Sequence, residues 1–565
     1  MTEIGDFTGN EYYVNREASW FSFLERVLSE GADPRYTDKE RARFLAIVSG
    51  SLDEFFAVRL ATLLRQKKEF PDLKDICGLT AEEQIGLVLK RAGEFLAEAD
   101  RVASSYVNHD SSRDIMLTSR LFEDRLIPFN PAAIKSESVN IILKSKDGCA
   151  RYLLPLNSPS KRIVFSGDGI GVGRQAHLLE DILRNSDGIL PDFIDTSEIS
   201  VFKAVRDRDE IYDWDPTPAG MEMWLKDLKN APFVCCILKD TASSDTVDYL
   251  AKKLKLTKDS IFKSSFVDLG FVSELFRKES PEDTEKTLAV KGSVFRKTGA
   301  FSYISERDHI CLLPYESFDC VTDLLREAAS DPDVISIRQT LYRTGKDSKV
   351  TDLLCKAAKN GKDVTVLMEL RARYDEERNL ENTKKLTAAG AKVLFGRAGI
   401  KTHCKLLLIE RKEAGGIRRY AHISTGNYNE FTAKSYTDVG LFTASPGICD
   451  DVFSLFEYAS GKDEFHDLYS LSASPRGLKE EFLRLIDRER TFAEAGKSAK
   501  ISAKVNSLCD RDFIEALYRA AASGVKVTLI VRGICCLKLD DPRLKDNLTV
   551  YSVVGKQLEH SRIFR

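Results

Sequence analysis

The most constraining feature of this 565-residue sequence is a regular alternation of helical and strand patterns that begins near Pro314. Amphipathic segments at 319–331, 349–361 and 377–390 are each followed by an aliphatic run, at 334–343, 363–370 and 391–396. A crossover of this length carries the chain from one parallel strand to the next. The sequence therefore predicts an α/β layer with a largely parallel sheet.

The pattern before this region is different, and the chain is too long for a single hydrophobic core. Long amphipathic helices fill residues 1–110, and one of them begins with a Thr80–Glu83 capping box. Short β-like and helical runs then alternate up to about residue 300. We predict a multidomain α/β protein with a helical domain (1–110), an α+β domain (111–300) and two α/β domains (301–470 and 471–565).

Composition excludes several classes of protein. The net charge is −3, so the whole chain has no polyanion-binding signature, and no run of 18 apolar residues predicts a transmembrane helix. The N-terminus lacks the pattern of a secretory signal. The 12 cysteines include no C-x-x-C pair, so neither a metal knuckle nor a disulfide framework is indicated. A reduced, cytoplasmic location is expected.

Charge is unevenly spread along the chain. Residues 331–436 hold 21 Lys and Arg against 13 Asp and Glu, an excess of eight positive charges. The rest of the chain must then carry about −11 for the total to be −3. A solvated basic face would explain this excess, and so would a site for a multiply charged anion.

The segment GIKTHCKLLLIE, residues 399–410, favours the anion site. It predicts a buried strand on which Lys401, His403 and Lys405 share one face, because side chains alternate along a strand. A lone histidine is more often a packing residue. Here neighbouring cations would keep the imidazole of His403 neutral and nucleophilic, and lysines neutralise phosphoryl oxygens. The turn STGNYN, residues 424–429, offers donors suited to an oxyanion.

An internal echo suggests a second half-site. Residues 357–373 resemble 520–536, and each segment follows a helix and contains arginine after a strand. The first leads to His403 and the second to His560, in QLEHSRIF. Two similar halves that each deliver a histidine predict paired α/β domains with a shared site. The spacing H-x-K, followed by a turn with Gly and Asn, resembles a phospholipase D-type half-site. That resemblance implies that one histidine attacks a phosphoryl group and the other acts as acid and base.

Arginines follow several of the predicted strands, where ligands bind in open α/β sheets. They suggest a channel for phosphate groups and are Arg343, Arg371, Arg373 and Arg532.

At this point the sequence resembles a known family, the long bacterial-type polyphosphate kinases. The resemblance runs nearly end to end, through motifs that occur in the family's order: NREASWFSFLERVL, FLAIVSGSLDEFFAVR, LPYESFD, DPDVISIRQTLYRTGKDS, ELRARYDEE, IKTHCKLLLI, RRYAHISTGNYN, AKSYTDVGLFTA, LIVRGICCL and LEHSRIF.

The resemblance implies reversible transfer of the ATP γ-phosphate to inorganic polyphosphate through a phosphohistidine. His403 would be the nucleophile, assisted by Lys405, with His560 as acid and base. Ser51, Tyr436, Arg532 and His560 would bind ATP. Arg343 and Arg373 would lie at a Mg²⁺–phosphate site and hold the phosphates that carry the ion, because arginine cannot ligate a metal.

The resemblance also implies the character of each domain. Residues 1–110 would contact the nucleotide, 111–300 would form a dimerisation-type domain, and 301–470 and 471–565 would be phospholipase D-like. Mg²⁺ is the expected cofactor, and ATP, ADP and polyphosphate are the expected partners. A homo-oligomer, either a dimer or a tetramer, is expected, with no nucleic acid bound. Peripheral membrane association is left open.

The sequence departs from the family pattern at two places. Ser51 stands where the family has Asn before Leu-Asp-Glu-Phe, which puts base contacts in question. The family pattern also continues beyond Arg565, so we expect the last domain to be truncated and the strand bearing His560 to lack sheet neighbours. Two alternatives follow: a phospholipase D-like phosphodiesterase, or an inactive polyphosphate-binding protein.

Overall fold

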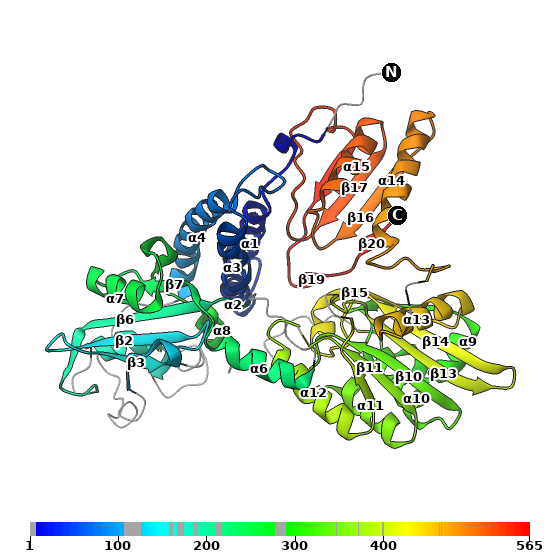
Figure 1. The fold of residues 1–565 in the computed structure, drawn as a ribbon, viewed down its shortest axis with the longest axis horizontal. Coiled ribbons are helices and arrows are strands. Elements are labelled where there is room, and N and C mark those ends of the chain that lie inside the picture. Colours follow the sequence, from blue (N-terminus) through cyan, green and yellow to red (C-terminus); the bar gives the residue numbers. More distant parts are fainter. Residues whose placement is uncertain are drawn as a thin grey trace. The chain divides into compact units, whose positions relative to one another are not determined.

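The computed structural model describes residues 7–106, 126–156, 162–166, 175–185, 189–208, 217–276, 290–345, 347–370, 372–397, 400–462, 464 and 466–565 (Figure 1). The chain forms two compact units. The N-terminal unit comprises Tyr13–Tyr212 and Lys226–Thr284, and the C-terminal unit comprises Met1–Tyr12, Asp213–Leu225 and Glu285–Arg565. The finer division into four domains stays a prediction.

Helices α1 to α4 open the N-terminal unit, at Arg16–Ala32, Asp38–Phe55, Ala61–Glu69 and Ala81–Ala103, with a π-helical turn at Phe56–Leu60 between α2 and α3. Side chains satisfy the first backbone N–H groups of three of these helices. Asn15 caps α1, and a capping box begins α2. The predicted Thr80–Glu83 box is present at the start of α4.

A six-stranded sheet follows in the order β1-β3-β2-β6-β7-β8. Its strands are β1 Ile127–Pro128, β2 Val139–Ser145, β3 Arg151–Pro155, β6 Ile194–Arg206, β7 Phe233–Lys239 and β8 Ile261–Ser264, and β4 Ile163–Ser166 pairs separately with β5 Gln175–Leu178. The helices are α5 Leu179–Asn185, α7 Ser244–Leu254 and α8 Gly270–Glu274. Buried Lys203 on β6 contacts Asp53 of α2 at 2.7 Å and Asp268 at 2.8 Å. This ion-paired lysine ties the helices to the sheet.

An eight-stranded sheet dominates the C-terminal unit, in the order β12-β11-β10-β13-β14-β15-β19, with β9 also paired to β15. Its strands are β9 His309–Leu313, β10 Val334–Leu341, β11 Asp363–Met368, β12 Lys392–Leu394, β13 Leu406–Glu413, β14 Gly416–Ser424, β15 Tyr436–Thr443 and β19 Leu558–Glu559. The helices are α6 Pro218–Leu228, which continues into the N-terminal unit, α9 Ala300–Glu306, α10 Asp319–Ser330, α11 Lys349–Lys359, α12 Glu376–Ala388 and α13 Pro446–Ala459.

The prediction of a largely parallel sheet is wrong here. β10, β11 and β12 are parallel to one another and β15 is parallel to β19, whereas the pairs β10–β13, β13–β14, β14–β15 and β9–β15 are antiparallel. One of these antiparallel pairs, β13–β14, is joined by a tight hairpin between Glu413 and Gly416, where Gly416 has a φ of 118°. Glycine adopts this backbone conformation without steric cost, so β14 folds directly back on β13.

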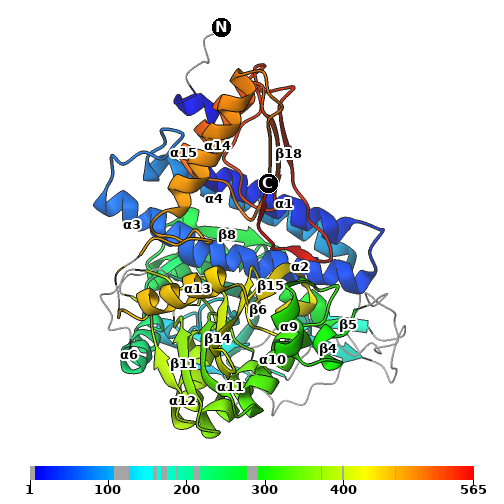
Figure 2. The same cartoon turned by 90° about the vertical axis from the view of Figure 1, so that its right-hand side faces the viewer.

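The uninterrupted apolar run at the start of β13 is buried on both faces of the sheet. Leu407 and Ile409 join the core formed with α10, α11 and α12. Leu406 and Leu408 face the opposite way and pack with Phe456 of α13. Figure 2 shows α13 and the α10–α12 group flanking these strands. A strand covered on both faces needs apolar side chains at every position.

A second, smaller sheet has the order β18-β17-β16-β20. Its strands are β16 Lys500–Val505, β17 Lys526–Val531, β18 Leu548–Tyr551 and β20 Ile563–Phe564, with helices α14 Leu478–Glu494 and α15 Arg511–Ala522. It repeats the first sheet in miniature. β16, β17 and β18 are parallel, as are β10, β11 and β12, and β20 runs antiparallel to β16 as β13 does to β10.

The predicted mixed fold is therefore confirmed: it has a helical region, an α+β region with one sheet, and two α/β regions with one sheet each. Among the described residues, no helix is both long and apolar enough to cross a membrane.

Candidate active site

Equivalent edges of the two C-terminal sheets carry the predicted site residues. Because β13 runs antiparallel to β10, its N-terminal end lies at the edge where β10 ends. His403 precedes β13 and Arg343 follows β10 at this edge. In the second sheet His560 precedes β20, which runs antiparallel to β16, and Arg532 follows β17. The echo seen in the sequence is thus a repeat of topology.

Residues 401–405 differ from the prediction. They form an extended segment that leads into β13, which begins only at Leu406. The backbone of this segment is fixed from outside the strand: Thr402 N–H donates to Glu369 at 2.8 Å, and the Cys404 carbonyl accepts from Thr340 Oγ1 at 2.9 Å. His403 between them is exposed, whereas Lys405 is buried. The histidine is therefore held by its neighbours while its own ring stays accessible.

His403 is a neutral imidazole in these surroundings. The surrounding protein atoms hinder its charging, and the charges of Lys405 and Arg562 add to this, so that its pKa falls to about 4. His560 and Arg343 act in the same direction. The Tyr342 ring meets the imidazole edge-on, with 4.9 Å between centroids. A neutral ring with an open face can attack phosphorus at any pH well above 4.

Lys405 is a buried lysine close to its titration midpoint at neutral pH. Burial lowers the pKa of its ammonium to about 7, and Arg562 contributes to the shift. Its Nζ donates to the His403 carbonyl and lies 5.2 Å from the centroid of the Tyr342 ring. This lysine therefore contacts the backbone of His403 and lies near enough to Arg562 for the charge of the arginine to lower its pKa.

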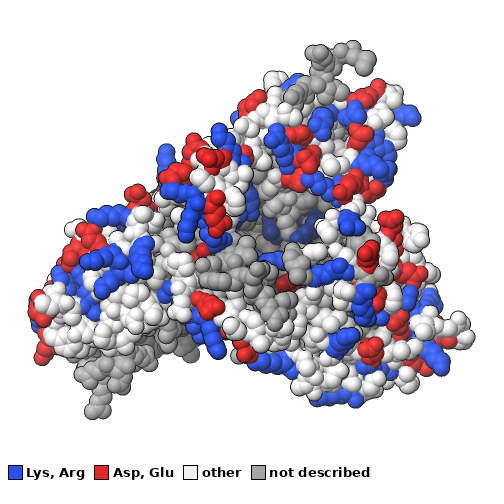
Figure 3. Space-filling view, in the orientation of Figure 1, with Lys and Arg blue, Asp and Glu red and all other residues white. Residues whose placement is uncertain are grey.

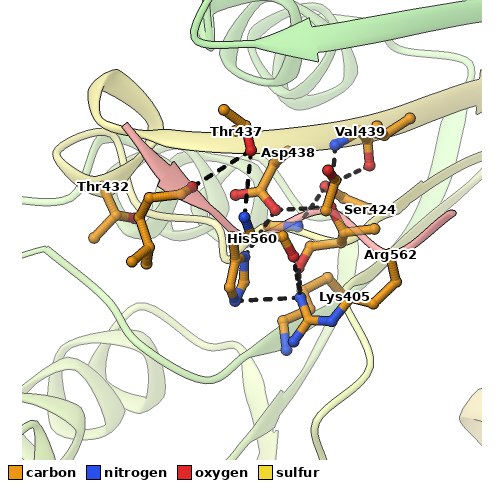
Figure 4. A network of polar contacts seen from close by, with 12 residues as sticks. Lys405, Ser424, Thr432, Thr437, Asp438, Val439, His560 and Arg562 are labelled. Carbon is orange, nitrogen blue, oxygen red and sulfur yellow. Dashed lines mark hydrogen bonds and ion pairs between the residues drawn. The ribbon is translucent and has the colours of Figure 1, made fainter. Parts of the chain in front are cut away.

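His560 is oriented by a carboxylate of the first sheet. Its Nδ1 contacts Asp438 Oδ1 at 2.8 Å, and Asp438 belongs to β15 (Figure 4). Arg562 Nη1 lies 3.2 Å from Nε2 of the same ring. Because arginine only donates, Nε2 accepts and Nδ1–H donates to Asp438. Burial lowers the His560 pKa, and Asp438 opposes that shift. The arrangement leaves Nε2 unprotonated, as an acceptor beside Arg562.

The turn STGNYN supports Asp438, and its predicted role as a source of oxyanion donors stays a prediction. Thr425 Oγ1 donates to Asp438 at 2.7 Å, and Asn429 Oδ1 accepts the backbone N–H of Phe431 at 2.9 Å. A Cβ at Gly426 would lie 2.6 Å from Asp438 Oδ2. Only glycine leaves room there for the carboxylate that orients His560.

Two site residues escaped the sequence analysis, Asp438 and Arg562. Arg562 stands two residues after His560, as Lys405 stands two residues after His403, so the H-x-K spacing recurs as H-x-R. That recurrence could have identified Arg562 in the sequence. Asp438 lies far from His560 along the chain, and only the β15–β19 pairing brings the two together. No local signal could have revealed that contact.

The prediction that the strand bearing His560 lacks sheet neighbours is wrong. β19 pairs in parallel with β15, and β20 pairs with β16. His560 N–H donates to the Thr437 carbonyl at 3.3 Å, and Arg565 N–H donates to the Ser502 carbonyl at 2.8 Å. The side chain of His560 is buried. The two sheets therefore hold the histidine from both sides.

The predicted phosphate-binding residues are partly buried at the same edges. Arg532 Nη1 donates to the Glu559 carbonyl at 3.3 Å, and its Nε is buried without a hydrogen-bond partner among the described atoms. The Tyr436 ring lies 5.4 Å from the His560 ring, between centroids. Arg343 Nε lies 3.7 Å from Asp375 Oδ2. Arg373 follows β11.

Two of the predicted residues, Arg371 and Ser51, are not placed at this site. Arg371 lies outside the described residues. Ser51 lies on α2 in the N-terminal unit, and its role in ATP binding stays a prediction.

Comparisons with known proteins point to the same family from the N-terminal to the C-terminal part of the chain. Three family models match: the polyphosphate kinase N-terminal domain over residues 13–115, C-terminal domain 1 over 299–464 and C-terminal domain 2 over 471–565. The chain is 35% identical to the polyphosphate kinase of Lactiplantibacillus plantarum, over 98% of its own length and 82% of the relative's. The Pseudomonas aeruginosa polyphosphate kinase is 33% identical, with 98% and 86% covered.

A solved structure shows the same arrangement of elements. The crystal structure of polyphosphate kinase from Porphyromonas gingivalis matches with a TM-score of 0.75 and 27% identity, over 98% of this chain and 85% of that one. Family models, relatives and fold all agree, and the chain belongs to the polyphosphate kinase family.

Proposed function

We propose that this polyphosphate kinase transfers the γ-phosphate of ATP reversibly to inorganic polyphosphate through a phosphohistidine on His403. The observation that carries the proposal is the convergence of unlike histidines from two repeated half-sites. His403 is accessible and neutral, and its pKa responds to His560 and Arg562 of the other half. His560 is buried and held by Asp438. One is suited to attack and the other to move a proton.

The first step forms a nitrogen–phosphorus bond. An imidazole nitrogen of His403 attacks the γ-phosphorus of ATP, the bond to the β,γ-bridging oxygen breaks, and ADP leaves. Lys405, Arg562 and Arg343 then stabilise the charge on the transferred oxygens. Nε2 of His560 could give a proton to the phosphate oxygen of the leaving group. In the opposite direction it could take a proton from the phosphate oxygen that attacks.

The second step restores the histidine. An oxygen of the terminal phosphate of a polyphosphate chain attacks the phosphorus, the nitrogen–phosphorus bond breaks, and the chain grows by one phosphate. The reverse sequence makes ATP from ADP. Both directions exchange one phosphoanhydride for another, so neither needs a further reactant.

Magnesium would reach this site with the nucleotide. Asp375 is the carboxylate next to Arg343, and Arg378 also pairs with it, at 2.8 Å. No group of three His, Cys, Asp or Glu donors gathers at this edge among the described residues. The residues therefore fit a Mg²⁺ ion that is bound mainly by ATP phosphates, which is common for this ion. Arg343 and Arg373 would grip the same phosphates. Oligomeric state, membrane association and cytoplasmic location stay predictions.

The proposal is tested with His403→Ala and γ-labelled ATP. We expect wild-type protein to acquire acid-labile label that polyphosphate can discharge, and His403→Ala to acquire none while keeping its circular dichroism spectrum. His466→Ala, which removes an exposed histidine outside the site, is the matched control and should label normally. Acid-labile label on His403→Ala would exclude His403 as the nucleophile.

A further inference from the structure

A second cluster of reactive side chains lies on the first C-terminal sheet. His309 and Cys311 are two residues apart on β9, and Cys320 is the second residue of α10. Their ligand atoms all lie within 4.8 Å of one another. Among the described residues this is the one group of at least three His, Cys, Asp or Glu donors with that spacing.

The cluster is buried, and it contains an unsatisfied nitrogen. Cys311 is 4% exposed and Cys320 is 1% exposed. His309 Nε2 is buried with no hydrogen-bond partner among the described atoms, and its nearest carboxylate oxygen, Glu316 Oε2, lies 3.4 Å away. Buried polar atoms normally have partners, so an orphaned imidazole nitrogen beside two sulfurs suggests a missing ligand.

We propose that His309, Cys311 and Cys320 bind one zinc ion, and that Glu316, which lies outside this group but 3.4 Å from His309 Nε2, moves to supply the fourth ligand. Thiolate and imidazole form the donor set that zinc prefers, in a tetrahedron with Zn–S bonds of about 2.3 Å and Zn–N bonds of about 2.0 Å. Donor atoms in such a tetrahedron lie roughly 3.5 Å apart, so donors within 4.8 Å need only a small contraction. Binding releases the thiol protons to solvent.

The position of Cys320 favours a thiolate. Cys320 lies in the first turn of α10, whose N-terminal end favours negative charge. A thiolate is the form of cysteine that binds metal.

The ion would act on structure and not on the reacting phosphate. It would fasten β9 to the start of α10, and β9 pairs with β15. In that pairing Leu313 lies opposite Asp438, the residue that orients His560. The site would therefore brace the strand that positions the catalytic base.

A disulfide between Cys311 and Cys320 is the competing state. It removes two electrons from the two sulfurs and so requires an oxidant, whereas zinc binding only displaces protons. The two states are distinguished by counting thiols in denatured, unreduced protein. Twelve reactive thiols are expected in the zinc form. A count two lower, with a linked peptide containing Cys311 and Cys320, would overturn the proposal.

The direct test is a Co²⁺ titration of the full, reduced and metal-stripped chain. One equivalent should produce a thiolate-to-cobalt charge-transfer band and the visible bands of tetrahedral Co²⁺, and one equivalent of Zn²⁺ should abolish both. Wild-type protein that gives neither band would overturn the proposal. This readout needs neither substrate nor activity.

Two variants assign the signal to the cluster. Cys320→Ser should lose the charge-transfer band or reduce it by at least half. Cys449→Ser, which changes another fully buried cysteine, on α13, is the matched control and should keep the band unchanged. An equal band in Cys320→Ser would place the metal elsewhere. The wild-type titration tests the proposal without any variant. The proposal therefore stays testable even if a variant does not fold.

Discussion

His403 and Lys405 stand two residues apart, yet they differ in charge state at neutral pH. The His403 pKa falls to about 4 and the Lys405 pKa to about 7, mainly because protein atoms displace water around both groups. The histidine is thus neutral throughout the physiological range. The lysine is the residue whose charge changes within it.

Lys405 predicts a loss of activity at alkaline pH. Its folded-state pKa of about 7 lies below the usual 10.5, so the ammonium is present below pH 7 and lost above it. We expect kcat/KM for ATP, which reports the free enzyme, to fall up to about tenfold per pH unit above pH 7. Lys405→Arg stays charged and should lack this limb, whereas Lys434→Arg, at an exposed lysine, should retain it. The same limb in Lys405→Arg would assign it to another group.

Asp438 predicts a loss of rate through His560. Asp438→Asn keeps the shape of the side chain but no longer favours the tautomer with hydrogen on Nδ1, so kcat should fall on the order of a hundredfold or more. The pH profile should lose the limb due to His560, which a purely structural defect would leave in place. Asp450→Asn, on an exposed aspartate that pairs with Arg419, is the control. A rate within about twofold of wild type would show that Asp438 does not orient the base.

At the scale of the elements, local periodicity predicted where helices lie, but it did not predict which strands pair with one another. The first of the helices predicted within residues 1–110 extends over Arg16–Ala32, and the Thr80–Glu83 box begins α4 as predicted. Those features depend on neighbours within one or two helical turns. The antiparallel half of the first sheet and the β15–β19 pairing depend on residues far apart in the chain. Periodicity within a segment carries no information on those partners.

The paired β19 and β20 predict slow amide exchange at the C-terminal end. The N–H groups of His560 and Arg565 donate to carbonyls of neighbouring strands. In hydrogen–deuterium exchange, a peptide covering 558–565 should be protected to a degree comparable with β15. The stretch 472–476 lies outside the named helices and strands and is exposed except at Ala473, so it should exchange fast and serves as the internal reference. Complete exchange of 558–565 within the shortest time would contradict the pairing.

At the scale of the whole molecule, positive charge is concentrated in one region of the chain, and the chain as a whole is slightly negative. The face shown in Figure 3 has Lys and Arg interspersed with Asp and Glu, in line with the net charge of −3. The positive residues proposed to bind phosphate are gathered at the sheet edges of the C-terminal unit: Arg343, Arg373, Lys405, Arg532 and Arg562. Attraction of a polyanion should therefore depend on this group.

That concentration of charge predicts a steep salt dependence for polyphosphate binding. Five contacts to phosphates of a flexible chain give a slope of log K against log salt of about −3.5, or roughly a hundredfold weaker binding between 50 and 200 mM salt. Arg532→Gln should reduce the slope by about 0.7. Arg326→Gln, at an exposed arginine on α10, should leave it unchanged. A Kd that varies less than about threefold over this range would rule out the cationic channel.

The pairing of β19 with β15 has a consequence for how such a protein can be divided. The second half of the C-terminal unit contributes a strand to the sheet of the first half, and there it meets Thr437 and Asp438. Two polypeptides made by cutting between residues 464 and 471 would each contain one of the two proposed catalytic histidines, His403 and His560, and neither would contain the pair. Their joint activity would rise with the product of their concentrations and vanish on dilution, as in a heterodimer. Although the topology is duplicated, the two halves of the proposed site would therefore function only together.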